Sequence, residues 1–90
     1  MSITINDFTR VKPSSMGNPR YVLHFLKMMN EEERFNYNLS IGSKYTIALN
    51  RAKKLGGKKF HNKQYGGGIV FQHYNLHSLS EKLNDLISKS

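Results

Sequence analysis

The residues of this chain that are best suited to chemistry lie between Arg51 and Gly68, where bases, aromatic rings and glycines are interleaved. Lysine neutralises phosphates and releases counterions, an exposed aromatic ring can stack on a base, and glycine lets a phosphate backbone approach the main chain. This mixture predicts a surface that contacts an anionic partner. With one lysine further upstream, its members are Lys44, Arg51, Lys53, Lys54, Lys58, Lys59, Lys63 and Tyr65.

The distribution of charge along the chain supports this interpretation. The 90 residues carry a formal net charge of +8. Residues 34–80 contain no acid and account for the whole excess, because residues 1–33 and 81–90 are each neutral. Charges that serve only solubility usually alternate in sign, so a stretch of one sign indicates an anionic partner. The competing explanation is structural: Phe60 would belong to the core, and the lysines would form the solvated side of a helix and a hairpin.

Two functional hypotheses follow from this surface. The leading one is a small non-enzymatic protein that binds DNA or RNA through the phosphate backbone. Such binding is expected to be largely independent of sequence, because lysine acts as a point charge and not as a bidentate reader of bases. The second is a protein-binding inhibitor, whose basic patch docks on an acidic surface of a nucleic-acid-handling protein.

Metal and cofactor chemistry is not expected. The chain has no cysteine, and no cysteine or carboxylate joins His73 and His77, which are four residues apart. His24 lies in an apolar run and is predicted to be a hydrogen-bonded core histidine. The glycines of 66–68 precede a predicted strand, whereas phosphate-binding loops precede a helix N-terminus. We therefore interpret them as a bulge or a tight entry to the strand.

Catalysis is expected to be absent as well. Paired carboxylates for general acid–base work are improbable, because the three glutamates of 31–33 have the character of a solvated loop and Glu81 is assigned to a helix cap. One enzymatic alternative stays open: a metal-independent ribonuclease, with His61, Tyr65 and neighbouring lysines as acid, base and phosphate clamp.

The elements that position these residues can be read from hydrophobic spacing. Residues 3–11 and 20–29 are predicted to be strands, joined through a turn at 12–19 that is rich in proline, glycine, serine and asparagine. Residues 30–42 are polar and fit either an acidic loop or a short distorted strand. Residues 58–61 and 68–73 predict a second hairpin.

Two helices complete the pattern. The first runs from Ser43, its predicted N-cap, to about Leu55, and ends at the two glycines of 56–57. The second is predicted to open with a capping box formed by Ser78 and Glu81. Apolar residues recur at helical spacing along one face of the first helix, at Tyr45, Ala48, Leu49, Ala52 and Leu55, and bases lie on the opposite face.

The expected architecture is therefore an α+β fold in one domain, residues 1–90. An antiparallel sheet of about four strands, in the order β-β-α-β-β-α, would carry two helices packed on one face. The small core makes a homodimer possible. No signal sequence and no bilayer-length apolar run are present, so a cytoplasmic protein without a membrane partner is expected.

Two stretches carry a family resemblance. The sequence from Ser15 to Tyr21, at the entry to a strand, and the glycine-rich sequence from Gly56 to Phe71 resemble segments of small uncharacterised proteins from phages and mobile elements. The resemblance covers about a third of the chain. It implies an accessory or host-manipulating role in a bacterial host cell. Some phage proteins of this size bind DNA, and others, including anti-CRISPR proteins, inhibit host nucleases or polymerases.

Overall fold

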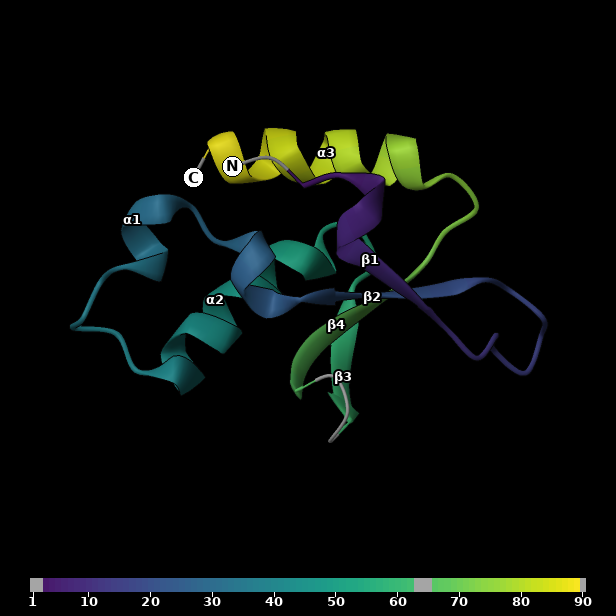
Figure 1. Ribbon diagram of the computed structural model, residues 1–90, viewed down its shortest axis with the longest axis horizontal. Coiled ribbons are helices and arrows are strands. Elements are labelled where there is room, and N and C mark those ends of the chain that lie inside the picture. Colours follow the sequence, from purple (N-terminus) through teal and green to yellow (C-terminus); the bar gives the residue numbers. More distant parts are fainter. Residues whose placement is uncertain (1–2, 63–65, 90) are drawn as a thin grey trace.

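The computed structural model of the protein describes residues 3–62 and 66–89, with the backbone alone at residues 61, 62 and 66 (Figure 1). The described strands form one antiparallel sheet in the order β1-β2-β4-β3. This confirms the predicted α+β class and the order of strands and helices. The elements along the chain are η1 (Ile5–Asp7), β1 (Phe8–Val11), β2 (Arg20–His24), η2 (Phe25–Met28), α1 (Glu31–Arg34), α2 (Ile41–Lys53), β3 (Lys58–Asn62), β4 (Gly66–Gln72) and α3 (Leu76–Ser88).

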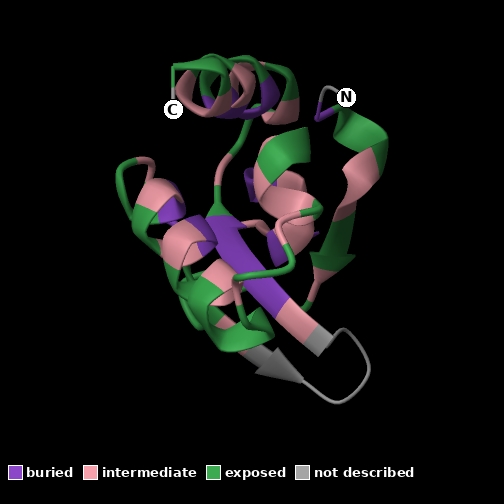
Figure 2. Cartoon of the chain, turned by 90° about the vertical axis from the view of Figure 1, so that its left-hand side faces the viewer, coloured by how far each residue is buried: buried purple, intermediate pink, exposed green. Residues whose placement is uncertain are grey.

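The core lies between one face of the sheet and the two long helices. Residues that stand opposite each other in an antiparallel pair point to the same face. Leu23 of β2 and Ile69 of β4 form such a pair and are fully buried. They pack in one cluster with Ala48 of α2 and Leu83 of α3. Figure 2 shows the middle of β4, residues 68–71, buried at the centre of the molecule.

The opposite face of the sheet is not covered by a helix in the described part of the chain. Its central pair, Val22 and Val70, is 4% and 9% exposed but lies outside the core cluster. The buried apolar residues of η2, α2 and α3 all belong to the cluster on the other side. We call this second surface the open face of the sheet.

Both N-terminal strands are shorter than predicted. Before β1, the chain forms η1, which Thr4 and Asp7 close with a capping box. The second strand ends at His24, whose Nδ1 accepts a hydrogen bond from the backbone N–H of Leu26 and so starts the turn of η2. His24 is exposed, so the prediction of a core histidine was wrong. Partial desolvation of the ring and the positive charge of Lys27 lower the pKa of His24.

Residues 30–42 form no strand: the acidic part folds into the short helix α1, residues 35–40 form a loop, and Ile41 begins α2. Asn30 and Glu33 close a capping box around the short helix α1, each side chain accepting from the other residue's backbone N–H. The box was readable as an Asn-x-x-Glu pattern, but the segment has no apolar period to mark a helix.

The caps of the long helices lie three residues earlier than predicted. Ser40, and not Ser43, is the N-cap of α2, and its hydroxyl accepts from the backbone N–H of Ser43. Asn75, and not Ser78, caps α3 in the same way. Each helix therefore gains a first turn that the sequence pattern had assigned to the preceding loop.

The glycines of 66–68 begin β4, as the strand-entry interpretation requires. Side chains, and not a neighbouring backbone, come closest to Gly67 and Gly68. A Cβ atom at Gly67 would lie 2.9 Å from Cδ1 of Phe25, and one at Gly68 would lie 2.7 Å from Cγ1 of Val22. These positions must stay without a side chain so that both residues can pack against the strand.

No helix in the described ranges is long and apolar enough to span a lipid bilayer.

Candidate nucleic-acid interface

Four of the predicted contact residues lie together at one edge of the molecule. Lys53 and Lys54 end α2, and Lys58 and Lys59 begin β3, which is an edge strand. The chain between them turns tightly, because the backbone N–H groups of 55 and 57 both donate to the carbonyl of Ala52, at 3.0 and 2.8 Å. We call these four lysines the basic edge.

The basic edge is exposed and wraps around the rim of the sheet. All four side chains are exposed, and none of them forms an ion pair with another residue in the described ranges. Lys58 stands opposite Val70 and therefore projects on the open face, whereas Lys59 stands opposite Ile69 on the helix side. Lysines on an edge strand also discourage pairing with another sheet, so their position has a structural use as well.

Arg51 is separated from this surface by its own contacts. Its guanidinium donates to both carboxylate oxygens of Glu33, at 2.6 and 2.7 Å, and to the carbonyl of Met28 at 3.0 Å. The hydrogen bond from Arg51 is the largest cause of the lowered pKa of Glu33. The side chain of Arg51 is only 14% exposed. Arg51 thus joins α2 to α1 and η2, and its charge is balanced inside the protein.

Lys44 lies toward the other end of α2. Its ammonium donates to the carbonyl of Arg34 at 3.0 Å and helps to close the end of α1. Nine residues of helix separate it from Lys53, which corresponds to about 14 Å. Lys63 and Tyr65, the remaining predicted contacts, lie outside the described residues, as does the side chain of His61.

A hollow of about 380 Å³ lies on the open face beside the basic edge. Arg20, which the sequence pattern did not select, forms part of its wall, and we call it the sheet-face hollow. Arg20 is far from the lysines in the chain, and only the pairing of β2 with β4 brings it near them. The residues that line the hollow are Arg20, Gly56, Lys58, Val70 and Gln72.

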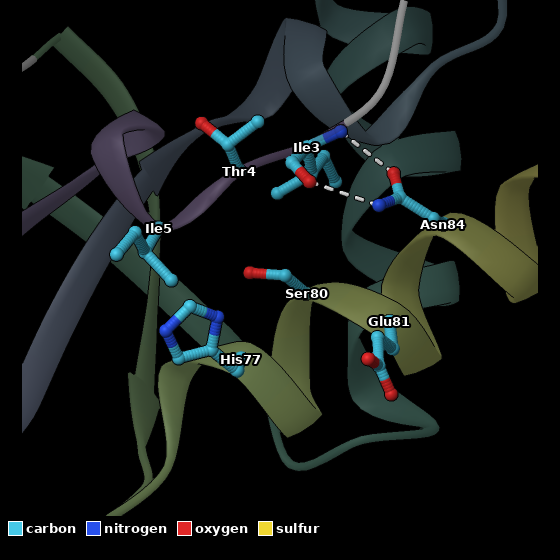
Figure 3. A pocket seen from close by; sticks show the side chains of 7 residues that line it. All are labelled: Ile3, Thr4, Ile5, His77, Ser80, Glu81 and Asn84. Carbon is cyan, nitrogen blue, oxygen red and sulfur yellow. Dashed lines mark hydrogen bonds between the residues drawn. The ribbon is translucent and has the colours of Figure 1, made fainter.

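A second hollow, of about 260 Å³, lies between the N-terminal segment and α3 (Figure 3). His77 and Glu81 both line it, but Figure 3 shows their side chains on either side of Ser80 and not directed toward each other. The hydroxyl of Ser80 donates to the carbonyl of Leu76 at 2.7 Å. A nucleophile with an adjacent base, as hydrolytic catalysis needs, is therefore not assembled here.

Asn84 closes one end of this second hollow. Its side chain accepts from the backbone N–H of Ile3 at 2.7 Å and donates to the carbonyl of the same residue at 2.9 Å. These two hydrogen bonds attach the backbone of the N-terminal segment to a side chain of α3. This hollow is thus explained by chain packing. No group of three or more metal-ligating side chains occurs among the described residues.

A comparison with models of protein families finds one that matches almost the whole chain. The model of the Staphylococcus phage terminal repeat-encoded protein TreK family matches residues 2–90. The chain belongs to this family. The match confirms the predicted resemblance to small phage-encoded proteins. No curated protein and no solved structure matches the chain.

This member of the TreK family also exposes apolar side chains beside the acidic helix α1. Phe35, Tyr37 and Ile41 are 70%, 96% and 75% exposed; the two rings lie between α1 and α2, and Ile41 is the first residue of α2. Large apolar side chains gathered in one exposed segment are a common mark of a protein–protein contact. We call these three residues the aromatic loop.

Proposed function

We propose that this phage protein binds nucleic acid through the phosphate backbone at the basic edge and catalyses no reaction. The observation that carries the proposal is the separation of charge in the fold. The basic edge holds four exposed lysines without ion-pair partners in the described chain, whereas every acid lies on η1, α1 or α3. A surface of one sign with no neighbouring counter-charge attracts a polyanion and releases its counterions on binding.

Three of the six acids also form ion pairs in the described ranges. Asp7 pairs with Lys27 at 3.3 Å, Glu33 with Arg51 at 2.6 Å, and Asp85 with Lys89 at 2.9 Å. These pairs balance charge on the helix side of the molecule and leave the positive charge of the basic edge without a paired acid in the described ranges. Since lysines supply it, the expected binding is strong at low salt and shows little preference for sequence.

The proposal is tested by charge reversal at two places. We compare Lys54→Glu/Lys59→Glu with Lys82→Glu/Lys89→Glu, a control that makes the same change of net charge on α3. Affinity for DNA and RNA oligonucleotides is measured by fluorescence anisotropy at several salt concentrations. Loss of two phosphate contacts lowers the slope of log affinity against log salt by about 1.4 to 1.8.

The edge variant should bind far more weakly than the α3 variant. Equal losses in the two variants would mean that net charge, and not the basic edge, governs binding. Wild-type protein that binds neither DNA nor RNA at low salt would refute the proposal. Cleavage of RNA in the presence of a chelator, abolished by His61→Ala, would instead favour the ribonuclease alternative.

A second candidate function, binding to a host protein, is favoured by the aromatic loop. An inhibitor of a nucleic-acid-handling enzyme would use these exposed rings as anchors. Phe35→Ser/Tyr37→Ser should then remove a partner that is still captured after nuclease treatment, and should leave binding to oligonucleotides unchanged. Partners that disappear with nuclease in the wild type were held through nucleic acid and support the first proposal.

A further inference from the structure

The sheet-face hollow gathers two cations over one central strand. Arg20 of β2 stands opposite Gln72 of β4, and Lys58 of β3 stands opposite Val70 of the same strand. Neighbouring strands are about 4.8 Å apart and the two positions are offset by two residues along β4, so the backbones of Arg20 and Lys58 lie roughly 12 Å apart. Both long side chains rise on the same face. Their charged ends can therefore reach a single group placed above β4.

The guanidinium of Arg20 is held in position by a hydrogen bond that engages only one of its nitrogens. Its Nε donates to the carbonyl of Lys12 at 2.8 Å, and no other bond to a described residue engages its two terminal nitrogens. Those two nitrogens form the fork that binds phosphate oxygens in pairs. Val70, which is nine-tenths buried, and Gln72, whose side-chain amide carries N–H donors, also line the hollow.

The rest of the hollow suits an anion as well. Gly56 has a φ of +82°, which follows from its place after α2, and a Cβ atom there would meet nothing within 4 Å. The wall at this point is therefore open. The alternation of the strands also brings no acid to this face among the described residues. The residues that project there are Thr9, Val11, Arg20, Val22, His24, Lys58, Phe60, Gly68, Val70 and Gln72.

An aromatic ring stands on the same face, two residues from Lys58. Phe60 is half-buried, and its Cδ1 lies 3.5 Å from the place where Gly68 would carry a Cβ. The ring thus packs over β4 at a point where the strand has no side chain. A half-buried ring beside an anion site offers a surface on which a base can stack.

We propose that the sheet-face hollow binds a phosphate group of single-stranded nucleic acid between Arg20 and Lys58, with a neighbouring base stacked on Phe60. The inference rests on the proposed function and adds the site and the type of strand. Bases in a duplex are already stacked on each other and cannot reach a ring on a sheet, so the use of Phe60 requires an unpaired strand.

The test uses changes that leave the basic edge intact. Gln72→Glu places a carboxylate of the same shape in the hollow, at an exposed position, and Asn38→Asp makes the same chemical change in the distant loop before α2. Phe60→Leu keeps an apolar side chain but removes the stacking surface. Circular dichroism and thermal unfolding confirm that each variant is folded. If Phe60→Leu is not folded, Gln72→Glu and Arg20→Gln carry the test, because both residues line the hollow and neither belongs to the basic edge.

Affinities are measured for a single-stranded oligonucleotide and for the duplex of the same sequence. We expect wild type to prefer the single strand, Gln72→Glu to weaken its binding about tenfold, and Phe60→Leu to weaken it by a similar factor while changing duplex binding little. Asn38→Asp should bind as wild type does. Amide resonances of residues 70 and 72 should shift when the single strand is added.

The two proposals can fail separately. If Lys54→Glu/Lys59→Glu loses binding but Gln72→Glu and Phe60→Leu bind single strands as wild type does, the hollow is not the site and the basic edge alone carries the function. If wild type binds the duplex as tightly as the single strand, and Phe60→Leu weakens both equally, the stacking role is refuted. Absence of any binding by wild type refutes both.

Discussion

Replacement of Arg51 by alanine should destabilise the protein and leave nucleic-acid binding by the folded protein unchanged. The change removes two charge-assisted bonds to Glu33 and one bond to the carbonyl of Met28. Exposed ion pairs are worth up to about 1 kcal/mol and fully buried ones cost roughly 3–5 kcal/mol to break. With 14% and 20% of the two side chains exposed, we expect a loss of about 2 kcal/mol in the free energy of unfolding.

The loss is measured by urea denaturation and by thermal unfolding. For a domain of this size, about 2 kcal/mol corresponds to a melting temperature lower by roughly 8–16 °C. Lys53→Ala is the matched control, because Lys53 lies on the same helix and is exposed without an ion pair in the described chain. It should change the free energy of unfolding by less than about 0.5 kcal/mol, while weakening the binding of nucleic acid.

The pH dependence gives a second measurement of the same contact. The pKa of Glu33 is lowered in the folded protein, chiefly by the hydrogen bond from Arg51, so the unfolded chain takes up its proton at a higher pH than the folded one. The stabilisation is therefore complete above the ordinary value of 4.5 and is lost as the pH falls through the lower folded value. The difference in stability between wild type and Glu33→Gln should shrink over that acidic range.

One result would refute the reasoning about Arg51. If Arg51→Ala melts at the temperature of wild type and binds oligonucleotides more weakly, its guanidinium contacts the ligand and the bonds to Glu33 contribute nothing to stability. A stability difference between wild type and Glu33→Gln that is constant from neutral pH to below pH 4 would likewise show that the carboxylate charge is not used.

Two further predictions concern packing. Gly57→Ala would bring a Cβ within 2.6 Å of the Cβ of Ala52 and should lower the free energy of unfolding by about 2 kcal/mol. Gly42→Ala lies in the first turn of α2, where the new Cβ would meet nothing closer than 4.0 Å. It should raise the free energy of unfolding by roughly 0.5–1 kcal/mol. Urea denaturation that ranks the two variants the other way would contradict this account. Asn84→Leu removes both hydrogen bonds to the backbone of Ile3 and should lower the free energy of unfolding by about 1–2 kcal/mol. Amide hydrogen exchange at Ile3 should become faster. An unchanged exchange rate there would show that the N-terminal segment is held by other contacts.

The sequence was sufficient to predict the helices because their apolar faces repeat locally. It was not sufficient for their first residues. Ser40 and Ser43 are both good N-caps, and so are Asn75 and Ser78, and each helix could have begun at either member of the pair. Which of the two residues becomes the N-cap depends on the direction in which the preceding segment approaches the helix, and tertiary packing sets that direction. Helix α1 escaped prediction because a single polar turn has no hydrophobic period.

The long-range pairing of strands could not be predicted from local pattern. Both hairpins were expected, but nothing in the sequence indicates that β2 lies beside β4 and places β3 at the edge. That arrangement decides the two features on which the functional proposals depend. It makes Lys58 and Lys59 rim residues, and it brings Arg20 to the same face as Lys58.

The sum of charges along the chain does not identify Arg20 as part of the positive surface, whereas the fold does. The net charge of residues 1–33 is zero, so the sequence places Arg20 in a neutral segment. In the structure the acids that balance this segment lie on η1 and α1, on the helix side, while Arg20 projects on the open face. The positive surface is therefore larger than the acid-free stretch, and it extends from the rim of the sheet onto its open face. Because Arg51 is balanced by Glu33 and Arg20 is not balanced by any carboxylate on its face, the arginine that contacts a phosphate is expected to be Arg20.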